Sequence, residues 1–312
     1  MNISKTEILT ILEKFEIDFS IKTKIRNDKF RVSSIFKPIN NGFYFFNGTR
    51  LPITTINSLF IVHNSFDNFN GSNDFIVLKN RDPQTVYYKI LDFLFQRKSN
   101  GNISINSNIS NQSKIGKNVQ IDAFCVIEAG VTIGNDVIIG SGSKIHKNTF
   151  IGNDTIIESS SIIGTQGVAW VWDEEQKTKL VQPQLGGVEI GDNCFLGANT
   201  IIVRGSLNEN TYIGHNSLFA PGCRIGHGSI IGNFAHLANS VCTGGNINIG
   251  NNCFLGSGSI LRPKVKLHQN TIVGAGALVV KNTTKENLTL MGVPAKESLS
   301  KINPSGMPKP KI

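Results

Sequence analysis

The sequence predicts a mainly β protein, in which a three-sided parallel β-helix follows a small α/β domain. Three observations support this prediction. An aliphatic residue recurs every six positions from Ile103 onward, glycine follows many of those aliphatics, and the first hundred residues lack the repeat. A six-residue period matches neither an α-helix nor a single alternating strand, so each unit is a short strand and a turn. Three units form a coil of roughly 18 residues, and stacked coils pair as parallel strands.

The six-residue register runs in two stretches. The first places aliphatic residues at Ile103, Ile109, Ile115, Ile121, Ile127, Ile133, Ile139, Ile145, Ile151, Ile157 and Ile163. The register resumes at Ile190, slips by one residue near 205–212, and runs again from Ile213 to Val279 with Thr243 as a polar exception. We expect these side chains to point inward and form one continuous core, as in other solenoids.

Four of the five cysteines occupy one slot of this repeat. Cys125, Cys194, Cys223 and Cys253 each lie four residues after an aliphatic position, where small residues recur. We expect them to be small buried hydrophobes rather than nucleophiles. The odd number of cysteines and the lack of CxxC spacing favour neither a disulfide framework nor a zinc site, so we expect no metal and a reducing cytoplasm.

Charge and hydropathy restrict the partners of the chain. Its 312 residues carry a formal net charge of +9, which favours acidic partners such as nucleotide sugars, coenzyme A or acyl carrier protein. The basic residues form no dense stripe and no nucleic-acid-binding motif, so we expect no nucleic acid partner. The sequence has no run of 18 apolar residues and no apolar N-terminal signal segment, which predicts a cytoplasmic protein without a membrane span.

The first hundred residues predict the α/β domain. Ser4-Lys5-Thr6-Glu7 reads as a capping box, and apolar residues at helical spacing follow it. Residues 30–78 contain mostly extended segments, and Asp82-Pro83 starts a second helix. We therefore divide the chain into this domain (1–100), the β-helix (101–296) and a basic, proline-rich tail (297–312).

Over residues 101–296 the repeat resembles that of the hexapeptide-repeat acyltransferases. This resemblance implies left-handed coils, although parallel crossovers in general favour the right hand, and it implies a homotrimer. The N-terminal domain resembles that of UDP-3-O-acylglucosamine N-acyltransferase, a lipopolysaccharide enzyme that holds uracil with an aromatic residue and an Asn three positions on. Tyr44 and Asn47 match that spacing, so they are candidate nucleotide contacts; the alternative is that they are ordinary strand and turn residues.

His227 is the candidate catalytic residue. Its segment RIGHG (224–228) resembles the catalytic segments of the lipid A enzymes and of the nucleotide-amino-sugar N-acetyltransferases. An unperturbed imidazole titrates near pH ~6.5 and can take a proton from an attacking amine. Gly228 stands where the amino-sugar enzymes often have an acid, so the residue that orients His227 is not evident. Analogy gives His236 a place in the acyl-donor site, or else at the trimer interface, and gives Gly245 as a backbone donor to the oxyanion.

The segment MGVPAK (291–296) resembles the closing segment of coenzyme A-dependent hexapeptide acetyltransferases. In those enzymes the last coil flanks the cofactor, which implies donor-binding roles for Gly292, Pro294, Ala295 and Lys296. The lipid A enzymes instead use acyl carrier protein and dock it on a helical extension, whereas only sixteen residues follow Lys296 here. We therefore favour acetyl-CoA or another acyl-CoA as the co-substrate.

The insertion at 165–187 interrupts the solenoid, and a long insertion usually reaches over a site. It carries Trp170, a candidate substrate contact; a contact with a neighbouring subunit and a plain hairpin are the alternatives. These features together predict an N-acyltransferase that moves an acetyl or short acyl group from acyl-CoA to the amino group of a UDP- or dTDP-linked amino sugar.

Three other classes of protein are alternatives to this prediction. One is a UDP-3-O-acylglucosamine N-acyltransferase that uses acyl carrier protein, and one is a non-catalytic hexapeptide scaffold. A γ-class carbonic anhydrase shares the fold but needs a close pair of metal-binding histidines, and His227 and His236 are nine residues apart.

Overall fold

The computed structural model describes residues 1–22, 27–69 and 71–299 of the chain. The chain divides into two compact units, Met1–Arg97 and Lys98–Ile312, and each is described by itself. Within the described residues, neither helix has the length and apolar character that crossing a bilayer requires.

The N-terminal unit is a six-stranded sheet with two helices. The strand order is β1-β3-β4-β5-β6-β2, and β3 to β6 run parallel to one another. Its elements are β1 (Asn2–Ser4), α1 (Lys5–Lys14), β2 (Phe19–Lys22), β3 (Lys29–Val32), β4 (Gly42–Phe46), β5 (Leu59–His63), β6 (Asp74–Leu78) and α2 (Pro83–Phe95).

Both predicted helix starts are confirmed. The Ser4 hydroxyl accepts the Glu7 N–H, and the Glu7 carboxylate accepts the Ser4 N–H at 2.7 Å. The Asp82 carboxylate accepts the Thr85 N–H at 2.7 Å at the start of α2. The sequence reasoning missed the short strands β1 and β2, which pair antiparallel at the two edges of the sheet.

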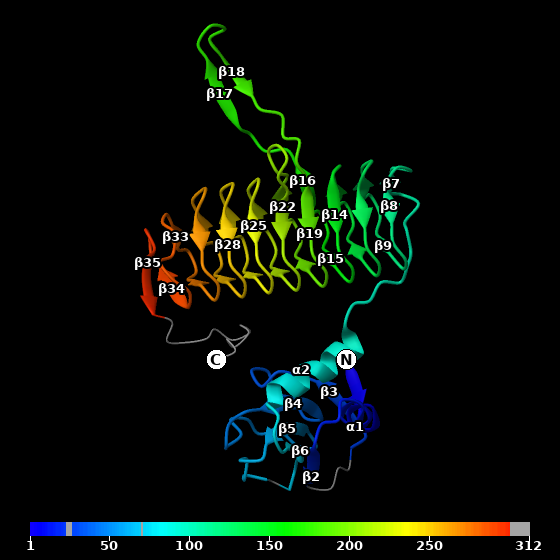
Figure 1. Ribbon diagram of the computed structural model, residues 1–312. Helices are drawn as coiled ribbons and strands as arrows, with labels where there is room; N and C mark the ends of the chain where they lie inside the picture. The colour runs from blue at the N-terminus through cyan, green and yellow to red at the C-terminus, as the bar shows by residue number, and fades with distance from the viewer. Residues whose placement is uncertain (23–26, 70, 300–312) are drawn as a thin grey trace. The chain divides into compact units, whose positions relative to one another are not determined.

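The second unit is the predicted parallel β-helix, whose strands stack in three sheets along the prism (Figure 1). We number its faces in the order in which the chain crosses them. Face 1 holds β7 (Asn108–Ile109), β10 (Val126–Ile127), β13 (Lys144–Ile145), β16 (Ile162–Thr165), β21 (Ile201–Val203), β24 (Arg224–Ile225), β27 (Cys242–Thr243), β30 (Ile260–Leu261) and β33 (Leu278–Val279).

Face 2 holds β8 (Lys114–Ile115), β11 (Thr132–Ile133), β14 (Thr149–Ile151), β19 (Val188–Ile190), β22 (Thr211–Ile213), β25 (Ile230–Ile231), β28 (Asn248–Ile249) and β31 (Lys266–Leu267). Face 3 holds β9 (Gln120–Ile121), β12 (Ile138–Ile139), β15 (Ile156–Ile157), β20 (Phe195–Leu196), β23 (Leu218–Phe219), β26 (His236–Leu237), β29 (Phe254–Leu255), β32 (Ile272–Val273), β34 (Leu288–Met291) and β35 (Lys296–Leu299). The predicted tail therefore begins inside β35, and its residues 300–312 lie outside the described part of the chain.

The repeated aliphatic residues form the core of the prism, and the prediction that they point inward is confirmed between Ile121 and Val279. The prediction is wrong at Ile103, which is 49% exposed. Ile103 makes only an isolated bridge to Ile121 in the outermost coil, so no further coil covers it. The four slot cysteines are buried, and burial raises the pKa of the Cys194 thiol to about 11 and that of Cys253 to about 12.

The corner between faces 2 and 3 is held by a ladder of side-chain hydrogen-bond acceptors, which are oxygens except for the Nδ1 of His215. The Asn135 side chain accepts the Lys117 N–H at 2.8 Å, and the Asn153 side chain accepts the Asn135 N–H at the same distance. The pattern continues along the prism through Asp192, His215, Asn233 and Asn251. We call this row the amide ladder. It links each coil to the next where the backbone turns.

Candidate active site

The corner between faces 1 and 2 carries both breaks of the six-residue repeat. The insertion leaves β16 and forms the hairpin of β17 (Trp170–Asp173) and β18 (Thr178–Val181) before β19 begins. In the next coil, residues 204–210 form a loop between β21 and β22 that makes the coil five residues longer than a regular one, because Ile202 pairs with Ile225 23 residues on, whereas Ile213 pairs with Ile231 18 residues on. Against a six-residue period this insertion appears as the one-residue slip. We call residues 204–210 the slip loop. The coil after that places His227 at the same corner, between β24 and β25.

The His227 imidazole is half-buried and held from two sides. Its Nδ1 lies 3.0 Å from the Ser206 hydroxyl of the slip loop. Its Nε2 lies so close to Gly245 that a Cβ on that glycine would be 2.4 Å from it. Gly245 is therefore required by the close approach of the ring, and the two ring nitrogens face different partners.

Two threonine hydroxyls replace backbone acceptors around His227. The Thr211 hydroxyl accepts the Gly228 N–H at 2.9 Å and donates to the Val203 carbonyl. The Thr243 hydroxyl accepts the Gly226 N–H at 3.2 Å. Thr243, the polar residue among the inward-pointing repeat positions, therefore bonds the residue directly before His227. At a regular corner both acceptors are backbone carbonyls, one of the next coil and one of the coil before, so this corner departs from the repeat on both sides of the histidine.

Glu209 closes the slip loop. One carboxylate oxygen accepts the Ser206 N–H at 2.7 Å and the other accepts the Leu207 N–H at 3.1 Å. Burial alone would raise the pKa of Glu209, but these backbone donors and the nearby His227 outweigh burial and hold the pKa below its ordinary value. The carboxylate thus stays ionised beside the imidazole near neutral pH.

The predicted donor residues fall into two groups. Gly245 lies with His227, whereas His236 lies on face 3 with its ring against Phe254, the centroids 5.1 Å apart. Burial lowers the pKa of His236. Face 3 lies opposite the corner between faces 1 and 2, so a single chain does not bring His236 and His227 together. Gly292, Pro294, Ala295 and Lys296 lie at the turn and first residue of the β34–β35 hairpin, which ends face 3.

Trp170 is not placed against His227. Within one chain the β17–β18 hairpin extends away from the coils (Figure 1), which agrees with the plain-hairpin alternative, and a contact of Trp170 with a substrate or a neighbouring subunit stays a prediction. The Lys179 ammonium lies 4.5 Å over the Trp170 ring, and β17 and β18 pack mainly on each other.

The assignment of Tyr44 to a nucleotide is also corrected by the structure. Its side chain is 1% exposed, and its ring stacks on Phe60 at 5.0 Å. Its hydroxyl donates to the Ile39 carbonyl at 2.9 Å. No ring face is left for a base. Asn47 is exposed, and its amide donates to the Asp82 carboxylate at 3.2 Å.

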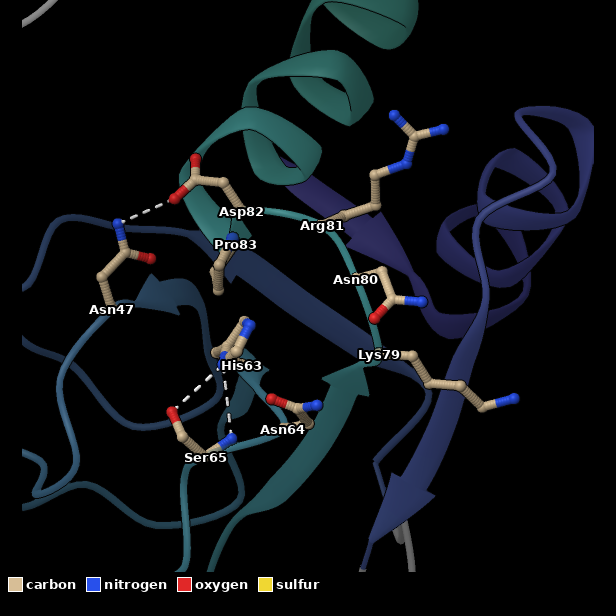
Figure 2. Close-up of a pocket in the computed structure, with 9 residues that line it drawn as sticks. All are labelled: Asn47, His63, Asn64, Ser65, Lys79, Asn80, Arg81, Asp82 and Pro83. Carbon is tan, nitrogen blue, oxygen red and sulfur yellow. Dashed lines mark hydrogen bonds between the residues drawn. The ribbon is translucent and has the colours of Figure 1, made fainter.

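Asn47 lines a polar pocket of about 540 Å³ in the N-terminal unit. The pocket lies at the carboxyl ends of β5 and β6 and the start of α2 (Figure 2). Its wall is formed by Asn47, His63, Asn64, Ser65, Lys79, Asn80, Arg81, Asp82 and Pro83. Ligands of open parallel sheets bind at this edge. Sequence reasoning missed the pocket, although polar residues directly follow the apolar runs of β5 and β6.

No cluster of three or more His, Cys, Asp or Glu side chains that could hold a metal ion occurs in residues 1–22, 27–69 and 71–299.

Comparison with known proteins places the coils in one class. A model of the bacterial transferase hexapeptide repeat matches residues 112–147, 206–239 and 246–281, and a model of the hexapeptide repeat of succinyl-transferase matches 187–205. The coils of the second unit are thus similar to bacterial transferase hexapeptide repeats over these segments.

Within that class, the chain is similar to two curated UDP-3-O-acylglucosamine N-acyltransferases. It is 30% identical to the Delftia acidovorans protein over 41% of this chain and 37% of the relative. It is 34% identical to the Bordetella parapertussis protein over 33% of this chain and 28% of the relative. The chain thus matches only 37% of the length of the first relative and 28% of the length of the second.

Solved structures of UDP-N-acetylglucosamine acyltransferases share the fold. The Bacteroides fragilis structure aligns with a TM-score of 0.55 at 26% identity, over 63% of this chain and 74% of that chain. The Moraxella catarrhalis structure aligns with a TM-score of 0.57 at 24% identity, over 62% of this chain and 73% of that chain.

Proposed function

We propose that this protein is an acyltransferase that N-acylates a nucleotide-linked amino sugar with an acyl-CoA donor. The observation that carries the proposal is the position of His227. Its Nε2 faces Gly245 at the one corner where two consecutive coils break the repeat. The similarity to acyltransferases of nucleotide sugars supports the reaction class.

The reaction is a direct transfer. The sugar amine attacks the thioester carbonyl carbon, a C–N bond forms, and the amine proton passes to His227 Nε2. The Gly245 N–H is the proposed donor to the oxyanion. The C–S bond then breaks, and the leaving thiolate takes the proton back from the imidazolium. Holding both reactants at the corner supplies much of the rate.

The pocket of the N-terminal unit is the proposed site for the nucleotide. Lys79, which also pairs with Asp18 at 3.1 Å, and Arg81 supply positive charge for the phosphates. The Asn47, Asn64 and Asn80 amides can pair with the edge of a base. The volume of about 540 Å³ lies within the range of small-molecule sites.

A homotrimer is part of this proposal. One chain keeps His227 at the corner between faces 1 and 2 and His236 on the opposite face. The two histidines can line one site only when face 3 of one chain meets that corner of another. The donor-side residues at the β34–β35 turn belong to the same face as His236, so an acyl-CoA would lie between two protomers.

Purified protein incubated with acetyl-CoA and a UDP- or dTDP-linked amino sugar should release free thiol and form the N-acyl sugar. His227→Asn should lower kcat by about 10²- to 10⁴-fold, because the general base is lost. His215→Asn is the matched control, since it changes a histidine at the other corner and should leave kcat unchanged. A trimeric His227→Asn protein that transfers at the wild-type rate would remove His227 as the general base, and a wild-type protein that transfers no acyl group would support the non-catalytic scaffold instead.

A second candidate is UDP-3-O-acylglucosamine N-acyltransferase, and the curated relatives favour it. It differs in the donor, which would be acyl carrier protein. Parallel assays with acetyl-CoA and with an acylated carrier protein decide between the two. Transfer only from the carrier protein, with a UDP-3-O-acylglucosamine acceptor, would replace the coenzyme A proposal.

A further inference from the structure

We infer that Ser206 and Glu209 are positioning residues that hold His227 in the tautomer needed for proton transfer. The inference rests on the proposed function, in which Nε2 of His227 is the base. The slip loop, which sequence reasoning treated only as an interruption of the repeat, is the element that carries both residues.

The first step concerns the ring nitrogens. Nε2 can accept a proton only when Nδ1 carries the ring hydrogen. Nδ1 lies 3.0 Å from the Ser206 hydroxyl oxygen. A serine hydroxyl oxygen can accept an N–H both from a neutral and from a protonated imidazole, so in this proposal the contact keeps the ring orientation throughout the reaction. Gly228, the residue after His227, has no side chain that could take this place.

The second step concerns Ser206 itself. Its backbone N–H donates to Glu209 at 2.7 Å, and the Leu207 N–H donates to the other carboxylate oxygen. The Ser206 carbonyl accepts the Leu185 N–H at 2.8 Å, which ties the slip loop to the base of the insertion. Ser206 is therefore fixed from both of its backbone groups, and its hydroxyl has a defined place beside His227.

The third step concerns charge. Glu209 is the carboxylate whose charge acts on His227 from the slip loop. The side chains of the neighbouring coils that bond the backbone on either side of His227, Thr211 and Thr243, are neutral, and Gly245, which lies against the ring, has none. Arg204 begins the loop, but its Nε donates to the Gly164 carbonyl of the preceding coil at 2.7 Å. Glu209 thus favours the imidazolium that forms when the amine proton arrives.

Substitutions in the slip loop test this inference. Ser206→Ala should lower kcat by about 10- to 100-fold, with the KM of both substrates within about 2-fold. Ser206→Thr should recover most of kcat, since it keeps the hydroxyl. Glu209→Gln should lower kcat by about 10-fold and move the acidic limb of the kcat/KM profile to lower pH, because a negative charge beside the base is removed. Asn208→Ala, an exposed change in the same loop, is the matched control.

A spectroscopic reading separates this inference from the proposed reaction. Long-range ¹H–¹⁵N spectra of the labelled ring should show the Nδ1–H tautomer of His227 in the wild type and a mixture of tautomers in Ser206→Ala. An Nε2–H tautomer in an active wild-type enzyme would overturn the inference while leaving the reaction intact. So would a Ser206→Ala protein with wild-type kcat, or a Glu209→Gln profile whose acidic limb does not move. Failure of the wild type to transfer any acyl group would instead remove the proposed function.

Discussion

Two corners of the same prism differ in how regularly the six-residue repeat continues from coil to coil. At the corner between faces 2 and 3, the amide ladder repeats along the coils, with Asn135, Asn153 and Asn233 each accepting a backbone N–H of the coil before. At the corner between faces 1 and 2, a hairpin, a slip loop and two threonine hydroxyls interrupt the repeat within consecutive coils. His227 lies at the irregular corner.

The difference shows how a solenoid can hold a site. At a regular corner, backbone N–H groups donate to acceptors of the neighbouring coil, and the corner side chains take part in these bonds. An irregular corner frees side chains from the repeat, as it does Ser206 and Glu209, and local irregularity of this kind is frequent next to active sites. The amide ladder carries stability along the prism while the other corner carries the candidate chemistry.

The largest expected contrast comes from one methyl group at each corner. A Cβ on Gly250 would lie 2.5 Å from the backbone N of Gln269, so Gly250→Ala must displace a coil and should cost about 1–3 kcal/mol. The three atoms nearest to a Cβ on Gly245 would all belong to the His227 ring. Gly245→Ala should therefore keep the melting temperature within a few degrees and lower kcat by about 100-fold.

Thermal unfolding and turnover of the two alanine variants check this contrast. The double variant Gly245→Ala with His227→Ala serves as the control, because removal of the ring relieves the clash and should restore any stability lost at Gly245. A Gly245→Ala protein as unstable as Gly250→Ala would show that the two corners do not differ in this respect.

A smaller effect is expected when the amide ladder is cut. Asn233→Ala removes the acceptor of the His215 N–H, which lies 2.9 Å from the Asn233 side-chain oxygen. The loss should be about 1 kcal/mol of unfolding free energy, with kcat unchanged, as read by urea unfolding and steady-state assays. Asn239→Ala, at an exposed corner position, is the control. A loss of turnover in Asn233→Ala would mean that the ladder also shapes the candidate site.

The smallest effect concerns an ion pair at the irregular corner. His146 Nδ1 lies 2.8 Å from the Glu128 carboxylate, whose other oxygen accepts the Lys147 N–H. Burial opposes ionisation of Glu128, but the Lys147 N–H and His146 outweigh it and lower the pKa of Glu128. The stabilisation is thus present above the ordinary carboxyl pKa and is lost as pH falls through the lowered one.

Glu128→Gln should therefore destabilise the protein by under about 1 kcal/mol at pH 7, since both side chains are partly exposed and screened by solvent. The difference from the wild type should shrink at an acidic pH below the lowered pKa of Glu128. Melting temperatures of both proteins at the two pH values measure it, and an equal difference at both would assign the effect to packing rather than to charge.

The sequence by itself determined the parts of the fold that repeat or that act locally. The six-residue period placed the strands and the buried aliphatics, and short-range capping signals placed α1 and α2. His227 is predicted as the catalytic residue because its segment RIGHG resembles the catalytic segments of hexapeptide-repeat acyltransferases. These features depend on residues close in the chain, so a linear sequence displays them directly.

Only the tertiary structure decided how the site is assembled. Neighbouring coils normally bring residues 18 apart together, as in the amide ladder, whereas Ser206 and His227 are 21 apart and meet because of the slip. The same holds for the burial of Tyr44, which stacking on Phe60 decides, and for the pocket at the ends of β5 and β6. Contacts across coils and strands depend on the exact register of the folded chain, and spacing in the sequence does not fix that register where the repeat is broken.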